Sequence, residues 1–245
     1  MGESIKKAYD ISSFMNGLDS LNLHLSEEQI NQFLSYYEML VEWNEFMNLT
    51  AITEFEEVVL KHFLDSLTLV KACELNNQSL IDIGTGAGFP GIPLKIVFPE
   101  LRITLLDSLN KRIHFLEEVI GRLGLKKIEA IHGRAEDYAR NSAYREQYDI
   151  CVSRAVSNMT TLSEYCIPFV KAGGIFVSYK SEKLIEELNE AKKAIQILGG
   201  VLKDQVEMTL PDSAIYRNLL VILKEKETPR KYPRKAGIPS KDPIR

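Results

Sequence analysis

The stretch that most constrains this fold is residues 80–91, where the sequence LIDIGTGAGFPG passes from an apolar run into closely spaced glycines. A parallel strand that is buried on both faces needs a nearly continuous apolar run, and residues 79–83 supply most of one. Gly84, Gly86 and Gly88 let the backbone turn with positive φ and lie close to a ligand that a Cβ atom would keep away. We therefore expect a strand, a glycine loop and a helix that together form a nucleotide-type cofactor site.

After this loop, apolar runs alternate with amphipathic helical patterns, as they do in βαβ units. The clearest helix spans residues 110–123, and two later β-like runs, 201–210 and 216–223, are joined by a turn sequence that favours an antiparallel hairpin. By analogy of fold, this plan is that of the α/β, Rossmann-like methyltransferases: a mostly parallel sheet with a C-terminal antiparallel hairpin. The predicted parallel strands are 80–83, 102–107, 128–132, 148–153 and 174–179.

The segment before the sheet has helical patterns. Ser26 and Gln29 match a capping box, and the apolar residues after them recur at the spacing of one helical face. A second helix is predicted from Glu54 to about Cys73, and a later one spans residues 181–198. We therefore divide the chain into a helical N-terminal region (1–75), the α/β cofactor-binding domain (76–224) and a basic C-terminal tail (225–245).

The charge distribution points to a polyanionic partner. Residues 224–245 hold eight Lys or Arg and three Asp or Glu, a local charge of +5, which leaves −9 for residues 1–223. The three cysteines and four histidines have neither disulfide-framework nor metal-ligand spacing. No apolar run approaches the ~20 residues of a membrane span, and the first residues lack the apolar core of a signal peptide. We expect a cytoplasmic protein without membrane contact, and infer no metal and no obligate protein partner.

The glycine spacing favours S-adenosylmethionine (SAM) over a dinucleotide. It is G-x-G-x-G, and Phe89 stands where the dinucleotide fingerprint has its last glycine. Asp82, at the strand end, places a carboxylate near the glycines, which suits the cationic ammonium and sulfonium of SAM. Asp107 ends the second strand and could accept both ribose hydroxyls in either class. Residues 133–137, GRAED, follow the third strand, where SAM enzymes hold the adenine. For the glycine stretch, the alternative interpretation is a tight turn that binds no ligand.

The residues after the fourth predicted strand narrow the chemistry. Enzymes that methylate exocyclic amines carry N/D-P-P-Y/F there, whereas this chain has SRA at 153–155. Enzymes that methylate pyrimidine C5 need a nucleophilic cysteine beside a proline, and Cys151 lies inside a strand, where we expect it in the core. The remaining possibility is that a lone pair that is already free attacks the methyl group directly. Purine N7 is a good candidate because it needs alignment with the methyl group and no general base.

Separated motifs carry a resemblance over nearly the whole chain: WN with NLTAI within 43–52, HFLDSL at 62–67, DIGTGAGFPG at 82–91, GRAE at 133–136, SRA at 153–155 and YPRKAGIP at 232–239. In this order they resemble the bacterial 16S ribosomal RNA (guanine-N7) methyltransferase G family, also called glucose-inhibited division protein B. The resemblance implies SAM-dependent methylation of N7 of one guanosine, position 527 in the 530 loop, of 16S ribosomal RNA or the small ribosomal subunit.

Two lines of inference give the predicted cofactor site. The residue pattern contributes Asp82, Gly86 and Asp107, and the resemblance implies Gly84, Phe89, Ala135, Glu136 and Arg154. Arg154 could bind the cofactor carboxylate or a phosphate, or form a buried ion pair. We favour positioning for it, because a cation against the guanine would oppose the positive charge that N7 methylation creates. No residue is assigned as catalytic with certainty, and the candidates are Arg154 and Lys180.

Lys180 ends the fifth strand and would face the substrate side of the sheet, unless it is an ordinary solvated lysine. His62 and Asp65 share a helix face that could meet the cofactor domain in a structural or a functional role. The tail cations could combine phosphate contacts with base stacking, or merely solubilise the chain. The candidate RNA-binding residues are Arg230, Lys231, Tyr232, Arg234 and Lys235.

Two alternative functions stay open at this stage. One is a SAM-dependent methyltransferase that acts on a small molecule or a protein. The other is a non-catalytic module that binds SAM or a nucleotide only for sensing.

Overall fold

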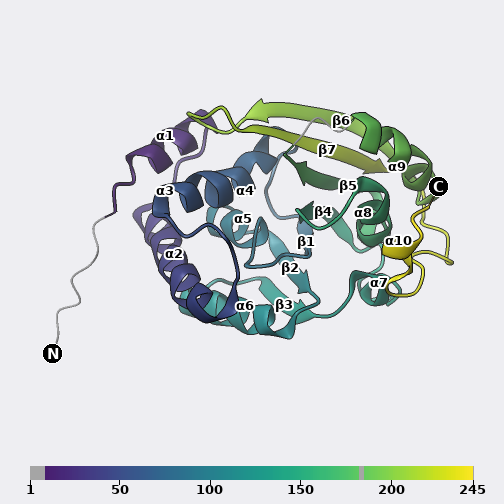
Figure 1. Cartoon of the computed structure of the whole chain (residues 1–245), viewed down its shortest axis with the longest axis horizontal. Helices are drawn as coiled ribbons and strands as arrows, with labels where there is room; N and C mark the ends of the chain where they lie inside the picture. Colours follow the sequence, from purple (N-terminus) through teal and green to yellow (C-terminus); the bar gives the residue numbers. More distant parts are fainter. Residues whose placement is uncertain (1–8, 182–184, 245) are drawn as a thin grey trace.

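The computed structural model describes residues 9–181 and 185–244, and it shows a twisted sheet between two layers of helices (Figure 1). The strand order is β3-β2-β1-β4-β5-β7-β6. The first five strands pair in parallel, whereas β7 runs antiparallel to both β5 and β6. This confirms the predicted fold class. The strands are β1 (Ser79–Ile83), β2 (Arg102–Asp107), β3 (Ile128–His132), β4 (Tyr148–Arg154), β5 (Val170–Lys180), β6 (Gly200–Thr209) and β7 (Tyr216–Lys224).

Successive residues of the central strands enter two different hydrophobic cores. On β1, Leu80 belongs to one core, whereas Ile81 and Ile83 belong to the other. On β4, Cys151 lies in the second core, as predicted. Because both faces of the sheet are covered, the strands appear in the sequence as continuous apolar runs. The second core is covered by α8 (Met159–Cys166), η3 (Ile167–Phe169) and α9 (Ile185–Ile197).

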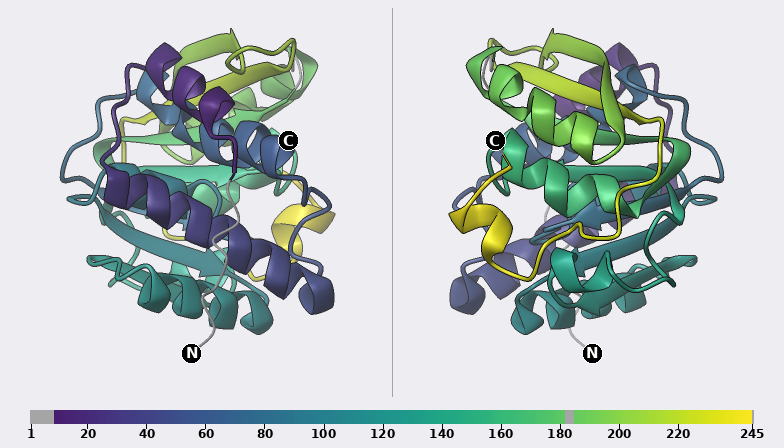
Figure 2. Two further views of the ribbon diagram at one scale, coloured as in Figure 1. Left: turned by 90° about the vertical axis from the view of Figure 1, so that its left-hand side faces the viewer. Right: turned by 90° about the vertical axis from the view of Figure 1, so that its right-hand side faces the viewer.

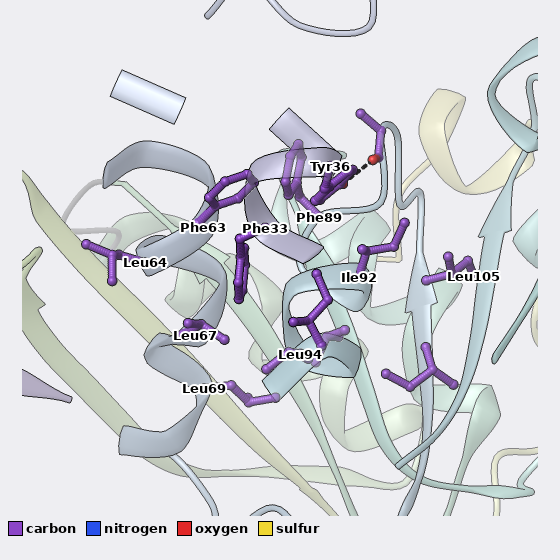
Figure 3. Packing of buried hydrophobic residues seen from close by; sticks show 14 of the residues in the cluster. Phe33, Tyr36, Phe63, Leu64, Leu67, Leu69, Phe89, Ile92, Leu94 and Leu105 are labelled. Carbon is purple, nitrogen blue, oxygen red and sulfur yellow. Dashed lines mark hydrogen bonds between the residues drawn. The ribbon is translucent and has the colours of Figure 1, made fainter. Parts of the chain in front are cut away.

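Helices from before the sheet complete the first core. The side chains of Phe33 and Tyr36 pack on Phe63, and those of Tyr36 and Phe63 pack on Phe89 of the glycine loop (Figure 3). The Tyr36 hydroxyl also donates a hydrogen bond to the Ala87 carbonyl in that loop. The N-terminal helices are therefore fixed directly on the glycine loop. The helices on this face are α1 (Ser12–Ser20), α2 (Glu27–Met47), α5 (Gly91–Val97) and α6 (Asn110–Arg122), with the segment 55–71 described next.

Several boundaries differ from the predictions. Helix α1 was not predicted, while the capping box that begins α2 is present as expected. The predicted helix from Glu54 is a helical segment with a π-helical turn inside it; π turns hold an extra residue and often occur at functional sites. Residues 182–184 of the predicted helix 181–198 lie outside the described residues. The helical segment 55–71 consists of α3 (Phe55–Val58), η1 (Val59–Leu64), α4 (Asp65–Leu67) and η2 (Thr68–Lys71).

The chain after β7 crosses back over the second core. It ends in the short helix α10 (Ile238–Lys241), which lies beside α8 and close to α7 (Ala135–Tyr138) in both Figures 1 and 2. Ile244 is buried in the second core. Within the described residues, no helix combines the length and the apolar composition needed to cross a lipid bilayer.

Candidate functional site

The site lies at the carboxyl edge of the parallel strands, where β1 sits between β2 and β4. The loops after β1 and β4 leave in different directions from this point, which is where open α/β sheets bind ligands. The two loops touch each other: a Cβ atom on Gly84, whose φ is +69°, would lie 2.6 Å from Cγ2 of Val156. Residues 154–157 separate two cavities, which we call the small and the large cavity.

The small cavity, of about 230 Å³, contains four of the predicted cofactor residues. Gly84 follows β1, Asp107 ends β2, and Ala135 and Glu136 lie on α7. Its two carboxylates can accept from hydroxyl or amino groups, and apolar side chains also line it. The lining residues are Ile83, Gly84, Leu106, Asp107, Ser108, Gly133, Arg134, Ala135, Glu136, Val156 and Tyr165.

Asp107 already has several donors in this structure. Its carboxylate accepts from the N–H groups of Gly86 and Leu109, each at 2.9 Å. Arg112 of α6 adds an ion pair at 3.1 Å. Since a carboxylate has about four acceptor positions, binding of ribose hydroxyls to Asp107 would displace Arg112. Gly86 thus takes its place in the site by orienting Asp107 through its backbone.

Asp82 lies beneath the glycine loop and outside the lining of either cavity. Its carboxyl group is completely buried and accepts from the Thr85 hydroxyl at 2.7 Å and from the Gly91 N–H at 2.9 Å. No described residue donates to its Oδ1 atom. Burial raises the pKa of Asp82 to about 7, although the donors and Arg154 oppose this shift. The structure thus places Asp82 as a support of the loop, and the predicted direct contact with a cofactor stays a prediction.

The large cavity, of about 510 Å³, lies on the other side of residues 154–157. Basic side chains outnumber acidic ones around it, which suits a ligand that carries a phosphate. The basic residues are Lys61, Arg154, Lys180 and Arg217, and the acidic ones are Asp65 and Glu187.

Asp65 joins three separate elements at this cavity. Its Oδ2 accepts from Arg154 of β4 at 2.8 Å, and its Oδ1 accepts from Nε of Arg217 of β7 at 2.7 Å. The buried ion pair that was left open as an alternative for Arg154 is therefore present. Arg154 also donates to the Lys61 carbonyl at 3.0 Å, and its guanidinium lies 5.1 Å from the centre of the Phe89 ring. This places Arg154 on the large cavity and leaves its predicted cofactor contact a prediction.

His62 shares the Phe89 ring with Arg154. The imidazole stacks on Phe89 at a centroid distance of 4.6 Å, and its Nε2 lies 2.9 Å from the Thr50 hydroxyl. Burial, followed by the nearby Arg154 charge, lowers the pKa of His62 to about 4. His62 is thus a neutral group at neutral pH. His62 and Asp65 do not bond each other; both meet Arg154.

Lys180 faces the large cavity, as its place at the end of β5 predicts. Its ammonium donates to Glu187 at 2.7 Å and to the Ser157 carbonyl at 3.1 Å. Since it is largely buried and paired, it is not a solvated surface lysine. Its second bond ties β5 to the segment that separates the two cavities.

The tail is folded onto the body, so its cations have different environments. Arg234 makes a two-pronged ion pair with Glu164, whose side chain is 1% exposed. Tyr232 packs against the second core. Arg230, Lys231 and Lys235 are exposed. Only these three of the four predicted cations are thus free of a buried partner among the described residues.

Comparison with known proteins identifies the family. The family described as "GidB: rRNA small subunit methyltransferase G" matches residues 29–216. The chain belongs to this family. A relative named ribosomal RNA small subunit methyltransferase G from Lachnoclostridium phytofermentans is 56% identical over 236 residues, covering 96% of this chain and 98% of the relative. One of the same name from Alkaliphilus metalliredigens is 54% identical over 231 residues, covering 94% and 97%.

Solved structures agree with the methyltransferase fold. A SAM-dependent methyltransferase from Aquifex aeolicus is similar with a TM-score of 0.53 and 16% identity, covering 72% of this chain and 97% of that one. TrmN from Thermus thermophilus is similar with a TM-score of 0.51 and 14% identity, covering 66% and 48%. At such low identity, these similarities show the fold of this rRNA small subunit methyltransferase G family member.

Sequence reasoning missed several residues of this family member's site. Arg217 is the second residue of β7, which is antiparallel to β5, so Asn218 pairs with Lys180 and the first residues of β7 lie at the carboxyl edge. Recognising that the second strand of the hairpin starts at this edge would have pointed to Arg217. Arg112, Val156 and Tyr165 carry no comparable signal, because their places depend on how loops and helices pack. Among the described residues, no group of three or more His, Cys, Asp or Glu side chains could hold a metal ion.

Proposed function

We propose that this chain transfers a methyl group from SAM to N7 of guanosine 527 in the 530 loop of 16S ribosomal RNA. The observation that carries the proposal is the pair of cavities on either side of residues 154–157: the small one is lined by the carboxylates of Asp107 and Glu136, and the large one by more basic than acidic side chains. Membership of the rRNA small subunit methyltransferase G family supports the same reaction class. Because the substrate is ribosomal RNA, we place the enzyme in the cytoplasm.

The small cavity has the donor and acceptor pattern that SAM needs. Asp107 and Glu136 supply carboxylates for ribose hydroxyls and the adenine region, and Gly84 lines the cavity with a left-handed backbone on which a Cβ atom would collide with Val156. When bound, SAM supplies a methyl group that is activated by a positive sulfur. Asp82, Gly86 and Phe89 act indirectly, because they hold the glycine loop and Asp107 in place.

The large cavity would hold the target nucleotide. Arg154, Arg217 and Lys180 provide positive charge for a phosphate, and Asp65 fixes the two arginines. The N7 lone pair of guanine is free, so no residue has to remove a proton from it. The chain's task is to align the base and exclude water. A neutral His62 beside the cavity does not oppose the positive charge that forms on the guanine.

The exposed tail cations Arg230, Lys231 and Lys235 lie outside both cavities and would contact phosphates of the flanking RNA.

Mapping 7-methylguanine on 16S RNA tests the proposal directly. RNA from cells with and without this chain is cleaved chemically at the modified base, and cleavage at position 527 should depend on the chain. An unchanged methylation pattern would refute the assignment. Release of S-adenosylhomocysteine with 16S RNA, and not with small molecules or proteins, separates the proposed enzyme from the two alternative functions.

A further inference from the structure

The C-terminal segment 228–244, which we call the strap, is bound to the body mainly through its backbone. Arg145 donates to the carbonyls of Thr228 at 2.6 Å and Tyr232 at 2.8 Å, and Arg140 donates to that of Pro233 at 2.9 Å. Such bonds fix the path of a chain whatever its side chains do. A flexible arm that waits for RNA would not use its carbonyls in this way.

A buried ion pair anchors the middle of the strap. The guanidinium of Arg234 donates to both carboxylate oxygens of Glu164, and the Arg234 N–H also donates to that carboxylate at 2.7 Å. Glu164 lies on α8 and is almost fully buried. A buried carboxylate without its partner is strongly destabilising, so this pair holds the strap firmly on α8.

The strap then contacts Glu136, which lines the small cavity. The Gly237 N–H donates to Oε1 of Glu136 at 2.8 Å, and the Pro239 carbonyl accepts from Thr161 of α8 at 3.2 Å. Glu136 is 5% exposed and lines the small cavity, as does Tyr165 of α8. No described residue donates to the other carboxylate oxygen of Glu136, so the strap orients this side chain and leaves one oxygen for a ligand.

The backbone at Gly237 is built for this contact. Its φ is +83°, and a Cβ atom there would meet nothing within 4 Å. Because a side chain would fit at this position, close packing does not explain why residue 237 is a glycine. The left-handed backbone itself is what requires glycine, and that backbone aims the N–H at Glu136.

We propose that the strap is a positioning element of the cofactor site: it holds Glu136 for SAM and thereby sets the affinity for SAM, while its anchor residue Arg234 does not contact RNA. This inference rests on the proposed function, because it takes the small cavity to be the SAM site.

Calorimetric titration of the full chain with SAM, in the absence of RNA, tests the proposal. In Gly237→Val the backbone leaves the left-handed region, and the dissociation constant for SAM should rise about tenfold, the effect of losing one hydrogen bond to a charged group. Gly173→Val is the matched control, because Gly173 has φ +84° and equally open surroundings but lies on β5. It should bind SAM as the wild type does.

A double-mutant cycle shows whether the strap acts through Glu136. In a Glu136→Gln background, Gly237→Val should change SAM affinity less than twofold, because the carboxylate it orients is gone. In turnover assays Gly237→Val should raise the KM for SAM and leave kcat and the KM for RNA unchanged. Unaltered SAM affinity in Gly237→Val, or an equal loss in both backgrounds, would overturn the proposal.

A second variant, with two substitutions, keeps the test valid if Gly237→Val does not fold. Arg234→Gln combined with Glu164→Gln replaces the ion pair by a neutral amide pair and leaves no buried charge. The paired variant should also weaken SAM binding while RNA binding stays within twofold. Weaker RNA binding with unchanged SAM affinity would contradict the proposal and assign the strap to RNA. If the wild-type chain bound no SAM, the proposed function itself would fail.

Discussion

Asp82 is a completely buried carboxyl group beneath the glycine loop. Burial raises its pKa to about 7, whereas an aspartate in an unfolded chain has a pKa of about 3.9. The folded state therefore binds this proton more tightly than the unfolded state does. The resulting stabilisation is fully present below about pH 4 and is lost as the pH rises through about 7. His62 has the opposite effect, because its lowered pKa of about 4 makes the folded state resist protonation.

We therefore expect Asp82→Asn to change the pH dependence of the free energy of unfolding. Wild type should lose up to roughly 4 kcal/mol relative to the variant between pH 4 and 8, since each pKa unit corresponds to about 1.4 kcal/mol. In the variant, the His62 contribution should appear as stability that rises between about pH 4 and 6.5. Urea denaturation across this range measures both effects. Parallel curves for the two proteins would contradict the buried, proton-binding state of Asp82.

Gly84 combines a left-handed backbone with close contact to the loop after β4. We expect Gly84→Asp to weaken SAM binding at least a hundredfold in calorimetry, since a side chain there would meet Val156 and put a negative charge into the loop. Gly173→Asp imposes a similar backbone strain in open space and serves as the control. Near-normal affinity in Gly84→Asp would show that the cofactor lies elsewhere.

At the scale of elements, Asp65 ties the segment after the π turn to β4 and β7 at once. Asp65→Asn would leave Arg154 and Arg217 facing each other without a common anion. The free energy of unfolding should fall by about 3 kcal/mol, as expected when one partner of a buried ion pair is removed. Adding Arg217→Gln should restore part of this loss, because it removes the repulsion between the two cations. Additive losses in the chemical-denaturation cycle would exclude the proposed coupling.

We expect the exposed cations of the tail to have a different role from that of Arg234, the anchor of the strap. Changing Arg230, Lys231 and Lys235 together to Gln should lower the salt dependence of RNA binding, with a slope reduced by about 2 if each contacts one phosphate. SAM affinity should stay as in wild type. The control is Lys192→Gln with Lys193→Gln, two exposed cations on α9. A slope that matches that of wild type would remove these residues from the RNA interface. Deleting the whole tail is less informative, because it also removes Arg234 and Gly237.

The strands and loops also show which parts of the structure could be predicted from the sequence. Alternating apolar runs predicted β1 to β5, because a sheet covered on both faces leaves a strong local pattern. The position of Asp107 at the end of β2 was predicted from the residue pattern, whereas Gly84 and Glu136 were implied by the family resemblance; all three line the small cavity. For Arg154 a buried ion pair was foreseen only as an alternative and without a named partner, and the contact of Gly237 with Glu136 was not predicted. Contacts between residues 101 positions apart depend on packing, which no local pattern encodes.

In the whole molecule, the N-terminal helices and the sheet share one core. The only tryptophan, Trp43 of α2, packs on Phe115 of α6. Unfolding followed by Trp43 fluorescence should therefore coincide with unfolding followed by far-ultraviolet circular dichroism, as a two-state transition requires. Tyr36→Phe, which removes the bond to the glycine loop, should shift both curves together. Two separate transitions would show that the region 1–75 folds independently of the domain 76–224.

The buried strap has a consequence for how the protein is made. A chain leaves the ribosome from its N-terminus, and structure forms as segments emerge. Residues 1–224 contain the whole sheet, yet Glu136 lacks its partner until Gly237 has emerged, and the second core lacks Ile244. The small cavity can therefore be completed only after residues 237–244 have emerged. A nascent chain whose strap is still inside the ribosome should therefore bind SAM more weakly than the same chain with the strap in place.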